Sequence, residues 1–313
     1  MTNREAIGTG IGKIILLGEH SVVYGKPAIA IPFSNTKVEA IIKKTNGDVT
    51  LDCVFFRGLL SNAPERILGT KTVIEKVVED LDKELRDFHI EINSTIPYES
   101  GMGSSAAVAV ATIRGLYRFF GESITNDRLI DLTNISEKIV HGNPSGIDTS
   151  VIVMETNLYY VKGKQLDPFH FKLDAYLIVA HTGSQSQTKD AVRDVRLLIE
   201  KNPKKYRPII DELGNIAYRG KMAMEGNNPI ELGNLMTRAH FLLDKLSVSN
   251  EKLNKLVDIS LDNGALGAKL TGGGRGGSMI ALCSTKDEAK YISNKLLDKG
   301  AKKVWVSNMG VDI

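Results

Sequence analysis

The sequence predicts an α+β protein, because strand-like and helix-like stretches are distributed unevenly along its 313 residues. Apolar runs typical of strands dominate the first half, whereas four long helical stretches follow one another in the second half. The second half also carries strand-like runs of its own. The length is enough for two ordinary domains. A break in the pattern at residues 162–165 predicts two domains, residues 1–170 and residues 171–313.

The first half is expected to alternate between strands and helices. Its expected strands are 6–17, 38–43, 49–56 and 88–94, and its expected helices are 70–85 and 126–140. The apolar runs 151–154 and 158–161 flank three turn residues and predict a hairpin. In the second half we expect strands at 175–180, 266–270, 278–283 and 303–307, and helices at 188–201, 206–224, 228–246, 250–262 and 286–298.

A glycine-containing loop joins the strand at 88–94 to a further expected helix. The stretch from Pro97 to Ala111 places Gly101 and Gly103 directly before small and apolar residues with helical spacing. Free N–H groups at a helix N-terminus bind anions, and glycine lets a phosphate approach the backbone closely. The hydroxyl groups at Ser104 and Ser105 can contact phosphate oxygens or a metal ion. The stretch therefore indicates a phosphate-binding loop, although an ordinary strand-to-helix turn can carry the same residues.

Two common nucleotide-binding patterns do not account for these glycines. Neither Gly12-Lys13 nor Gly25-Lys26 belongs to the G-x-x-x-x-G-K-[ST] motif of a P-loop. The segments 101–106 and 272–277 fit G-x-G-x-x-[G/A], but a dinucleotide fold requires a strand, a helix and a strand in that order. The first segment leads into two successive expected helices and the second into a strand. The context therefore disfavours a dinucleotide site.

Three charged side chains have the chemistry that phosphoryl transfer needs. The reaction uses cations, backbone N–H groups and Mg²⁺ around the phosphates, and a carboxylate that accepts the proton of the nucleophile. Lys13 lies among glycines before an apolar strand and is a candidate for holding negative charge. Glu137 near a helix end and Asp148 after a glycine-containing turn can face one pocket, one on a metal ion and the other as base. Each residue alone is also compatible with a solvated surface position.

Composition argues against several other classes of protein. The chain has 42% apolar and 25% charged residues, as soluble globular proteins do. No apolar run approaches the roughly 20 residues needed to span a bilayer, and the first residues lack the apolar core of a secretory signal. Cys53 and Cys283 fit no zinc or redox motif, so a cytoplasmic location is expected. The net charge is +3 with dispersed basic residues, which argues against nucleic-acid binding.

Three motifs taken together resemble the GHMP kinase superfamily of galactokinases, homoserine kinases, mevalonate kinases and phosphomevalonate kinases. In chain order they are G-K-I-I-L-L-G-E-H at 12–20, S-G-M-G-S-S-A at 100–106 and K-L-T-G-G-G-R-G-G at 269–277. The segments 18–25 and 137–148 are similar to the mevalonate kinase family in particular, in its short archaeal or bacterial form. The resemblance spans nearly the whole chain. It implies an N-terminal domain like ribosomal protein S5 domain 2 and a ferredoxin-like C-terminal domain.

The resemblance implies transfer of the γ-phosphoryl group of ATP to the 5-hydroxyl of mevalonate, a step of isoprenoid biosynthesis. Asp148 would accept the hydroxyl proton, and Lys13 would keep Asp148 ionised. Mg²⁺, a hard ion, would be held by the oxygen ligands of Ser105 and Glu137. The ATP phosphates would be bound by Glu99, Ser100, Gly101, Met102, Gly103, Ser104 and Ser105. The acceptor would be bound by Glu19, His20, Ser145 and Thr182, with His20 on its carboxylate or hydroxyl groups.

Three residues depart from the pattern of the superfamily. Arg275 and Glu99 stand where glycine is usual, and Tyr24 stands where many relatives have histidine. We expect Arg275 to point outward, with a phosphate-facing cation as the alternative, and Glu99 to turn away from the phosphates. A kinase for another small alcohol or for phosphomevalonate is the alternative enzyme, and a ligand-sensing relative is the alternative without activity. Assembly as a homodimer stays open.

Overall fold

The computed structural model describes residues 4–142, 144–186 and 188–310. The chain forms two compact units, each assembled from three separate segments. Unit 1 comprises residues 1–13, 36–96 and 103–155, and unit 2 comprises residues 14–35, 97–102 and 156–313. The sequence domains 1–170 and 171–313 stay a prediction.

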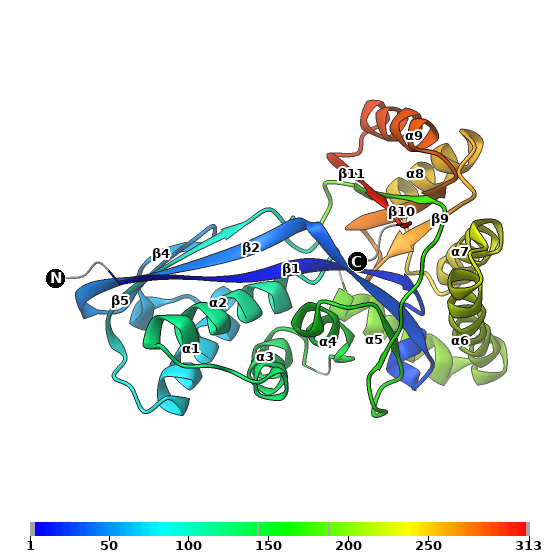
Figure 1. Cartoon of the computed structure of the whole chain (residues 1–313). Coiled ribbons are helices and arrows are strands. Elements are labelled where there is room, and N and C mark those ends of the chain that lie inside the picture. Colours follow the sequence, from blue (N-terminus) through cyan, green and yellow to red (C-terminus); the bar gives the residue numbers. More distant parts are fainter. Residues whose placement is uncertain (1–3, 143, 187, 311–313) are drawn as a thin grey trace. The chain divides into compact units, whose positions relative to one another are not determined.

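Unit 1 is a twisted sheet covered by helices on one face (Figure 1). The strands are β1 (Glu5–Leu17), β2 (Ala28–Asp48), β3 (Thr50–Cys53), β4 (Phe56–Leu59) and β5 (Arg86–Ser94), of which β1 and β2 also run into unit 2. The strand order is β4-β3-β5-β2, and β1 pairs with β2. Alternate residues of β2 (Val38, Ala40 and Ile42) are fully buried, as expected for a strand with one covered face.

The helices of unit 1 are α1 (Leu68–Asp80), α2 (Ser104–Phe120), α3 (Asn126–His141) and α4 (Ile147–Met154). Short 3-10 turns η2 (Leu60–Asn62) and η3 (Glu65–Ile67) precede α1. Glycines allow β1 to lie directly against α2. A Cβ atom at Gly8 would lie 2.0 Å from the carbonyl oxygen of Ala111, and one at Gly10 would lie 2.4 Å from that of Ala107. Gly8 and Gly10 are therefore positions at which β1 contacts the backbone of α2.

The predicted strand at 151–154, and with it the hairpin, is wrong, because these residues belong to helix α4. The helix begins after Gly146, which has a φ of 88°, and ends before Glu155, which has a φ of 51°. Three successive apolar residues, Val151, Ile152 and Val153, are all buried. Because successive apolar residues of this short helix are all buried, the run has no helical periodicity and cannot be told from a buried strand.

Unit 2 contains a four-stranded antiparallel sheet in the order β11-β8-β10-β9. Its strands are β8 (Tyr176–His181), β9 (Gly267–Thr271), β10 (Ser278–Cys283) and β11 (Lys303–Asn308). Helices α8 (Glu251–Asp262) and α9 (Lys286–Asp298) pack on this sheet, and α7 (Pro229–Lys245) packs on β9 (Figure 1). The remaining elements are η1 (Ser21–Tyr24), β6 (Leu158–Tyr160), β7 (Asp167–Pro168), α5 (Thr188–Lys201) and α6 (Pro203–Glu225).

Three helices of unit 2 begin in the same way. Asn202, Asn228 and Asn250 precede α6, α7 and α8, and each side chain accepts a hydrogen bond from a backbone N–H group in the first turn. Proline occupies the first position of α6 and α7, where no N–H donor is needed. All five helices predicted in the second half lie within three residues of their expected ends.

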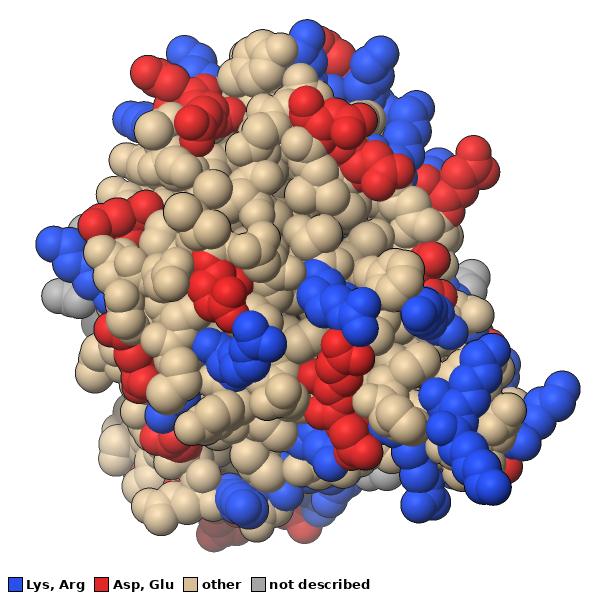
Figure 2. Space-filling view, turned by 90° about the vertical axis from the view of Figure 1, so that its right-hand side faces the viewer, with Lys and Arg blue, Asp and Glu red and all other residues tan. Residues whose placement is uncertain are grey.

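The α+β class predicted from the sequence is confirmed by these mixed sheets and helices. None of the helices in the described part of the chain is long and apolar enough to cross a membrane. On the face shown in Figure 2, acidic and basic side chains are interspersed with uncharged ones. Such a mixture is typical of a solvated protein surface.

We expect the substitution Gly8→Ala to destabilise the protein by about 2 kcal/mol or more, because the new methyl group would collide with the backbone of α2. Urea unfolding followed by circular dichroism measures the change. Asn46→Ala, at an exposed position near the end of β2, is the control and should lie within about 0.5 kcal/mol of the wild type. Equal unfolding midpoints for the two variants would contradict the close contact between β1 and α2.

Candidate active site

The structure brings Lys13 and Asp148 together in unit 1. Lys13 lies on β1, and its Nζ is 3.0 Å from Oδ1 of Asp148 in the first turn of α4. The Lys13 side chain is 2% exposed and that of Asp148 is 29% exposed. Since a buried ammonium group requires a counter-charge, the pair explains how a lysine is tolerated among the core residues of the unit. The Asp148 carboxylate keeps one side accessible to a ligand.

The end of the glycine-containing loop before α2 lies directly against Lys13. Gly103 has a φ of 75°, and a Cβ atom there would lie 3.0 Å from Cγ of Lys13 and 2.8 Å from Cδ1 of Ile152. Gly103 precedes α2, whose N-terminus has no side-chain cap. The N–H groups of the first turn, including those of Ser104 and Ser105, therefore lack acceptors within the helix. This arrangement places an anion-binding helix end next to the buried ammonium group.

Glu137 supplies a second carboxylate in the same region of unit 1. It lies near the end of α3, is 3% exposed, and its Oε1 atom has no hydrogen-bond partner among the described residues. Burial raises the pKa of Glu137, and nearby Asp148 raises it further, whereas His141, Ser105 and Lys13 act in the opposite direction. A cation beside Glu137 would satisfy the buried oxygen and favour the ionised carboxylate.

The donor set around Glu137 fits Mg²⁺ in the presence of a phosphate ligand. The described residues contain no cluster of three or more acidic, histidine or cysteine side chains that could hold a metal ion. Mg²⁺ usually takes one or two protein oxygens and completes its shell with water and substrate phosphates. The Glu137 carboxylate and the Ser105 hydroxyl, which lies close enough to affect the Glu137 pKa, are such oxygens.

Ser145 lies in the turn before α4, and its Oγ accepts a hydrogen bond from the Ile147 N–H group at 3.4 Å. The contact shapes the start of the helix that carries Asp148. Asn143, of the same motif, lies outside the described residues.

In unit 2, the third glycine run packs against Ser100 and Gly101 of the glycine-containing loop. A Cβ atom at Gly272 would lie 2.8 Å from Cα of Gly101, and one at Gly277 would lie 2.8 Å from the carbonyl oxygen of Ser100. Ser100 and Met102 are fully buried. Only glycine allows the two backbones to approach this closely, so the third motif holds the loop in place.

The backbone explains why glycine is usual at two of the departures. Glu99 has a φ of 49° and Arg275 a φ of 57°, in the left-handed region that glycine adopts without cost. The Glu99 side chain is exposed. The Arg275 guanidinium binds Asp194 of α5 at 2.6 Å and donates to the carbonyl oxygen of Ser247 at 3.0 Å. Arg275 therefore connects the glycine run to α5. The third departure, Tyr24, is half-buried in η1, and burial raises its pKa.

Glu19 is fixed by a residue to which the sequence analysis gave no role. Its carboxylate forms an ion pair with the ammonium group of Lys269 on β9, and both side chains are almost fully buried. Lys269 also donates to the carbonyl oxygen of Leu270 at 2.6 Å. A charged residue within an apolar strand was the signal in the sequence, since lysine is rarely buried without a partner.

His20 presents a hydrogen-bond acceptor. Its Nε2 atom donates to the carbonyl oxygen of Gly273 at 3.1 Å, and its Nδ1 atom is buried with no partner among the described residues. Burial lowers the pKa of His20 to about 4, and the positive charges of Arg275 and Lys269 contribute. The ring is therefore neutral at pH 7 and carries a lone pair on Nδ1. A neutral ring in this tautomer favours a hydroxyl group over a carboxylate as its partner.

The Thr182 hydroxyl is already engaged within unit 2. Its Oγ1 atom donates to the carbonyl oxygen of Gly277 at 2.9 Å and accepts from the Ser184 N–H group at 3.1 Å. Thr182 thus fixes the end of the third glycine run, and its contact with a substrate stays a prediction.

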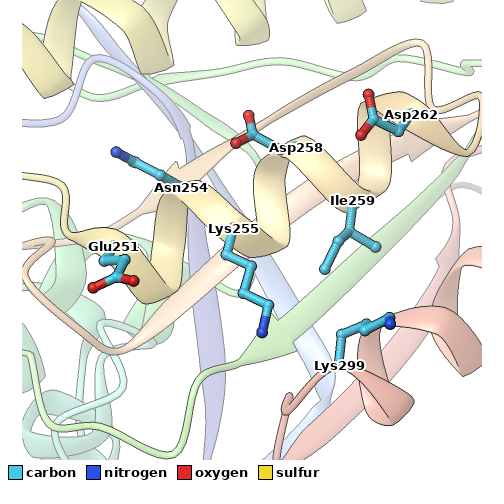
Figure 3. A pocket seen from close by; sticks show the side chains of 7 residues that line it. All are labelled: Glu251, Asn254, Lys255, Asp258, Ile259, Asp262 and Lys299. Carbon is cyan, nitrogen blue, oxygen red and sulfur yellow. The ribbon is translucent and has the colours of Figure 1, made fainter.

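A shallow hollow on unit 2 contains none of the predicted site residues. It is lined by side chains of α8 between Glu251 and Asp262 and by Lys299 after α9. Figure 3 shows Lys255 and Ile259 pointing toward the side on which Lys299 lies, whereas Asp258 and Asp262 lie on the other side of the helix. The hollow is open and its charges are mixed, so we assign it no role in the chemistry.

The His20 ring predicts a pH dependence of stability. Its pKa falls from 6.5 in the unfolded chain to about 4 in the folded one, so the unfolded state binds more protons between these values. The stability contributed by neutral His20 is complete above pH 6.5 and is lost as the pH falls toward 4, by an amount on the order of 3 kcal/mol.

We therefore expect His20→Gln to flatten the dependence of the unfolding free energy on pH in this range. Urea unfolding between about pH 4 and pH 7 measures it, and His170→Gln, at an exposed position, is the control. Identical slopes for the wild type and both variants would contradict a neutral, buried His20.

Two family models match the chain. The model described as "GHMP kinases N terminal domain" matches residues 70–156, and the one described as "GHMP kinases C terminal" matches residues 204–302. The chain is 39% identical over 304 residues to the mevalonate kinase of Thermococcus onnurineus, covering 90% of each chain. It is 38% identical to the mevalonate kinase of Pyrococcus horikoshii, covering 89% of each.

Solved structures show the same likeness over the whole chain. A structure of L. major mevalonate kinase in complex with R-mevalonate is 26% identical, with a TM-score of 0.85 and coverage of 99% of this chain and 98% of that one. Methanococcus jannaschii mevalonate kinase is 28% identical, with a TM-score of 0.83 and coverage of 97% and 98%. The two-domain GHMP kinase fold and the kinase class predicted from the sequence are confirmed. The chain belongs to the mevalonate kinase family of the GHMP kinases.

Proposed function

We propose that this protein transfers the γ-phosphoryl group of ATP to the 5-hydroxyl group of (R)-mevalonate, giving 5-phosphomevalonate and ADP. The observation that carries the proposal is the 3.0 Å contact between the buried Lys13 ammonium and the Asp148 carboxylate, which supplies a base beside a cation. The identity to mevalonate kinases over nine tenths of the chain supports mevalonate as the acceptor.

Asp148 is the proposed base. Its carboxylate accepts the proton of the 5-hydroxyl group while the hydroxyl oxygen attacks the γ-phosphorus and the bond from that phosphorus to the bridging oxygen of ADP breaks. The Lys13 ammonium group stabilises negative charge on the attacking oxygen. Because the Lys13 side chain is 2% exposed, water screens its charge little.

The N-terminus of α2 is the proposed phosphate site. Its first-turn N–H groups and the residues from Glu99 to Ser105 would surround the ATP phosphates, with Glu99 exposed and turned to solvent. Ser105 and Glu137 would hold Mg²⁺, which when bound neutralises charge on the phosphates.

Glu19, His20, Ser145 and Thr182 are the proposed acceptor residues. The neutral His20 ring can accept a hydrogen bond from a mevalonate hydroxyl group through Nδ1. A phosphomevalonate kinase would need additional positive charge for the acceptor phosphate. The two cations that influence His20, Lys269 and Arg275, are each paired with a carboxylate, which argues against that alternative. A ligand-sensing relative would not require the Lys13 and Asp148 pair.

A cytoplasmic location is part of the proposal. Both cysteines are free thiols, Cys53 half-buried and Cys283 buried, which is compatible with a reducing compartment. Assembly as a homodimer stays a prediction.

The test is an ADP-release assay with mevalonate, phosphomevalonate, homoserine and galactose as acceptors. We expect turnover with mevalonate and little with the others. Asp148→Asn should reduce kcat by about 10² to 10⁴ while ATP still binds, because an amide cannot accept the proton of the hydroxyl group. Asp131→Asn, at an exposed position of α3, is the matched control. A preference for another acceptor would contradict the assignment of mevalonate as the substrate. Normal turnover by Asp148→Asn would contradict the assignment of Asp148 as the base.

A further inference from the structure

Lys269 is among the largest fully buried side chains of the described residues. Its ammonium group contacts the Glu19 carboxylate and the carbonyl oxygen of Leu270. Removing two charges from water costs free energy that offsets much of their mutual attraction. Apolar side chains of similar volume often stabilise a core equally well. The pair therefore does something that an apolar contact would not do, which is to fix the position of a polar group.

Three contacts attach the segment 15–20 to β9 and the glycine run that follows it. Lys269 pairs with Glu19, the Thr271 hydroxyl donates to the carbonyl oxygen of Ile15 at 2.8 Å, and the Gly273 carbonyl oxygen accepts from His20 at 3.1 Å. Lys269 and Thr271 are two positions apart on a strand and point to the same face. Of the three attachments, the one from Lys269 is the ion pair.

The turn held in this way is strained. Gly18 has a φ of 98°, and His20, which is not a glycine, has a φ of 60°. Such a backbone persists only where its surroundings fix it. Glu19 lies between these two residues, so its ion pair acts at the centre of the turn. Loss of the pair would allow His20 to relax and its Nδ1 atom to move.

We propose that Lys269 is a positioning residue of the acceptor site, which holds Glu19 and thereby orients the Nδ1 atom of His20 toward the acceptor hydroxyl group. The inference rests on the proposed function for the identity of the acceptor. Lys269 itself contacts Glu19 and not the reacting atoms, so it acts on acceptor binding through the turn.

Steady-state kinetics separate positioning from a merely structural role. Lys269→Met should raise the KM for mevalonate about tenfold or more, because small displacements of a positioning group have large effects. The KM for ATP should stay within about twofold of the wild type. Lys269→Arg should restore part of the affinity for mevalonate. Lys43→Met, which removes the partner of Glu91 in an exposed pair, is the matched control and should change neither constant.

The double variant Glu19→Gln with Lys269→Met keeps the test decisive if the single variant does not fold. It leaves no uncompensated buried charge, so it should fold and still show the raised KM for mevalonate. An unchanged KM for mevalonate in any folded variant lacking Lys269 would overturn the proposal. Parallel increases in both KM values together with lost stability would overturn it as well, since they indicate a structural role alone.

A second readout does not depend on activity. In the wild type, ¹⁵N NMR of the His20 ring should show a protonated Nε2 and an unprotonated Nδ1 at pH 7. In Lys269→Met we expect exchange between the two tautomers, and an unchanged ring spectrum would overturn the proposal. If the wild type does not phosphorylate mevalonate, the proposed function fails, whereas the ring spectrum still tests the action of Lys269 on His20.

Discussion

A lysine buried in protein requires a counter-charge, and the site of unit 1 depends on how Lys13 meets this requirement. Asp148 provides the counter-charge, and α4 must begin where it does for Asp148 to reach Lys13. Gly103 must lack a side chain so that the start of α2 can lie against the Lys13 stem. The Lys13 ammonium group, the Asp148 carboxylate and the uncapped start of α2 are therefore placed by one set of contacts.

The same requirement organises unit 2 around Lys269. Its pairing with Glu19 holds the turn before η1, and the glycine run after β9 provides the acceptor for His20 and the surface on which Gly101 rests. Lys13 and Lys269 are both buried, but their partners differ. Lys13 is paired with a carboxylate that a ligand can reach, whereas Lys269 is paired with a buried one. The Asp148 side chain is 29% exposed, whereas the Glu19 side chain is 1% exposed.

Local signals made most of the fold predictable from the sequence. The helical stretches recognised in the second half predicted its helices to within three residues. The strand predicted at 151–154 was wrong because a run of successive buried apolar residues in a short helix shows no helical periodicity. Lys13 and Asp148 could be nominated from their motifs. Two features could not be predicted, because both arise from tertiary packing. They are the pairing of Glu19 with Lys269, which are 250 residues apart, and the buried Nδ1 atom of His20.

We propose that Lys13 and Asp148 act as one unit in phosphoryl transfer. The most direct measurement is the single-turnover rate of ADP formation for the wild type, Lys13→Met, Asp148→Asn and the double variant. When two residues act together, the effects of their substitutions on the rate are not additive. The double variant should therefore be about as slow as the slower single variant. A double variant whose loss equals the product of the two single losses would show that the residues act independently and would contradict the account.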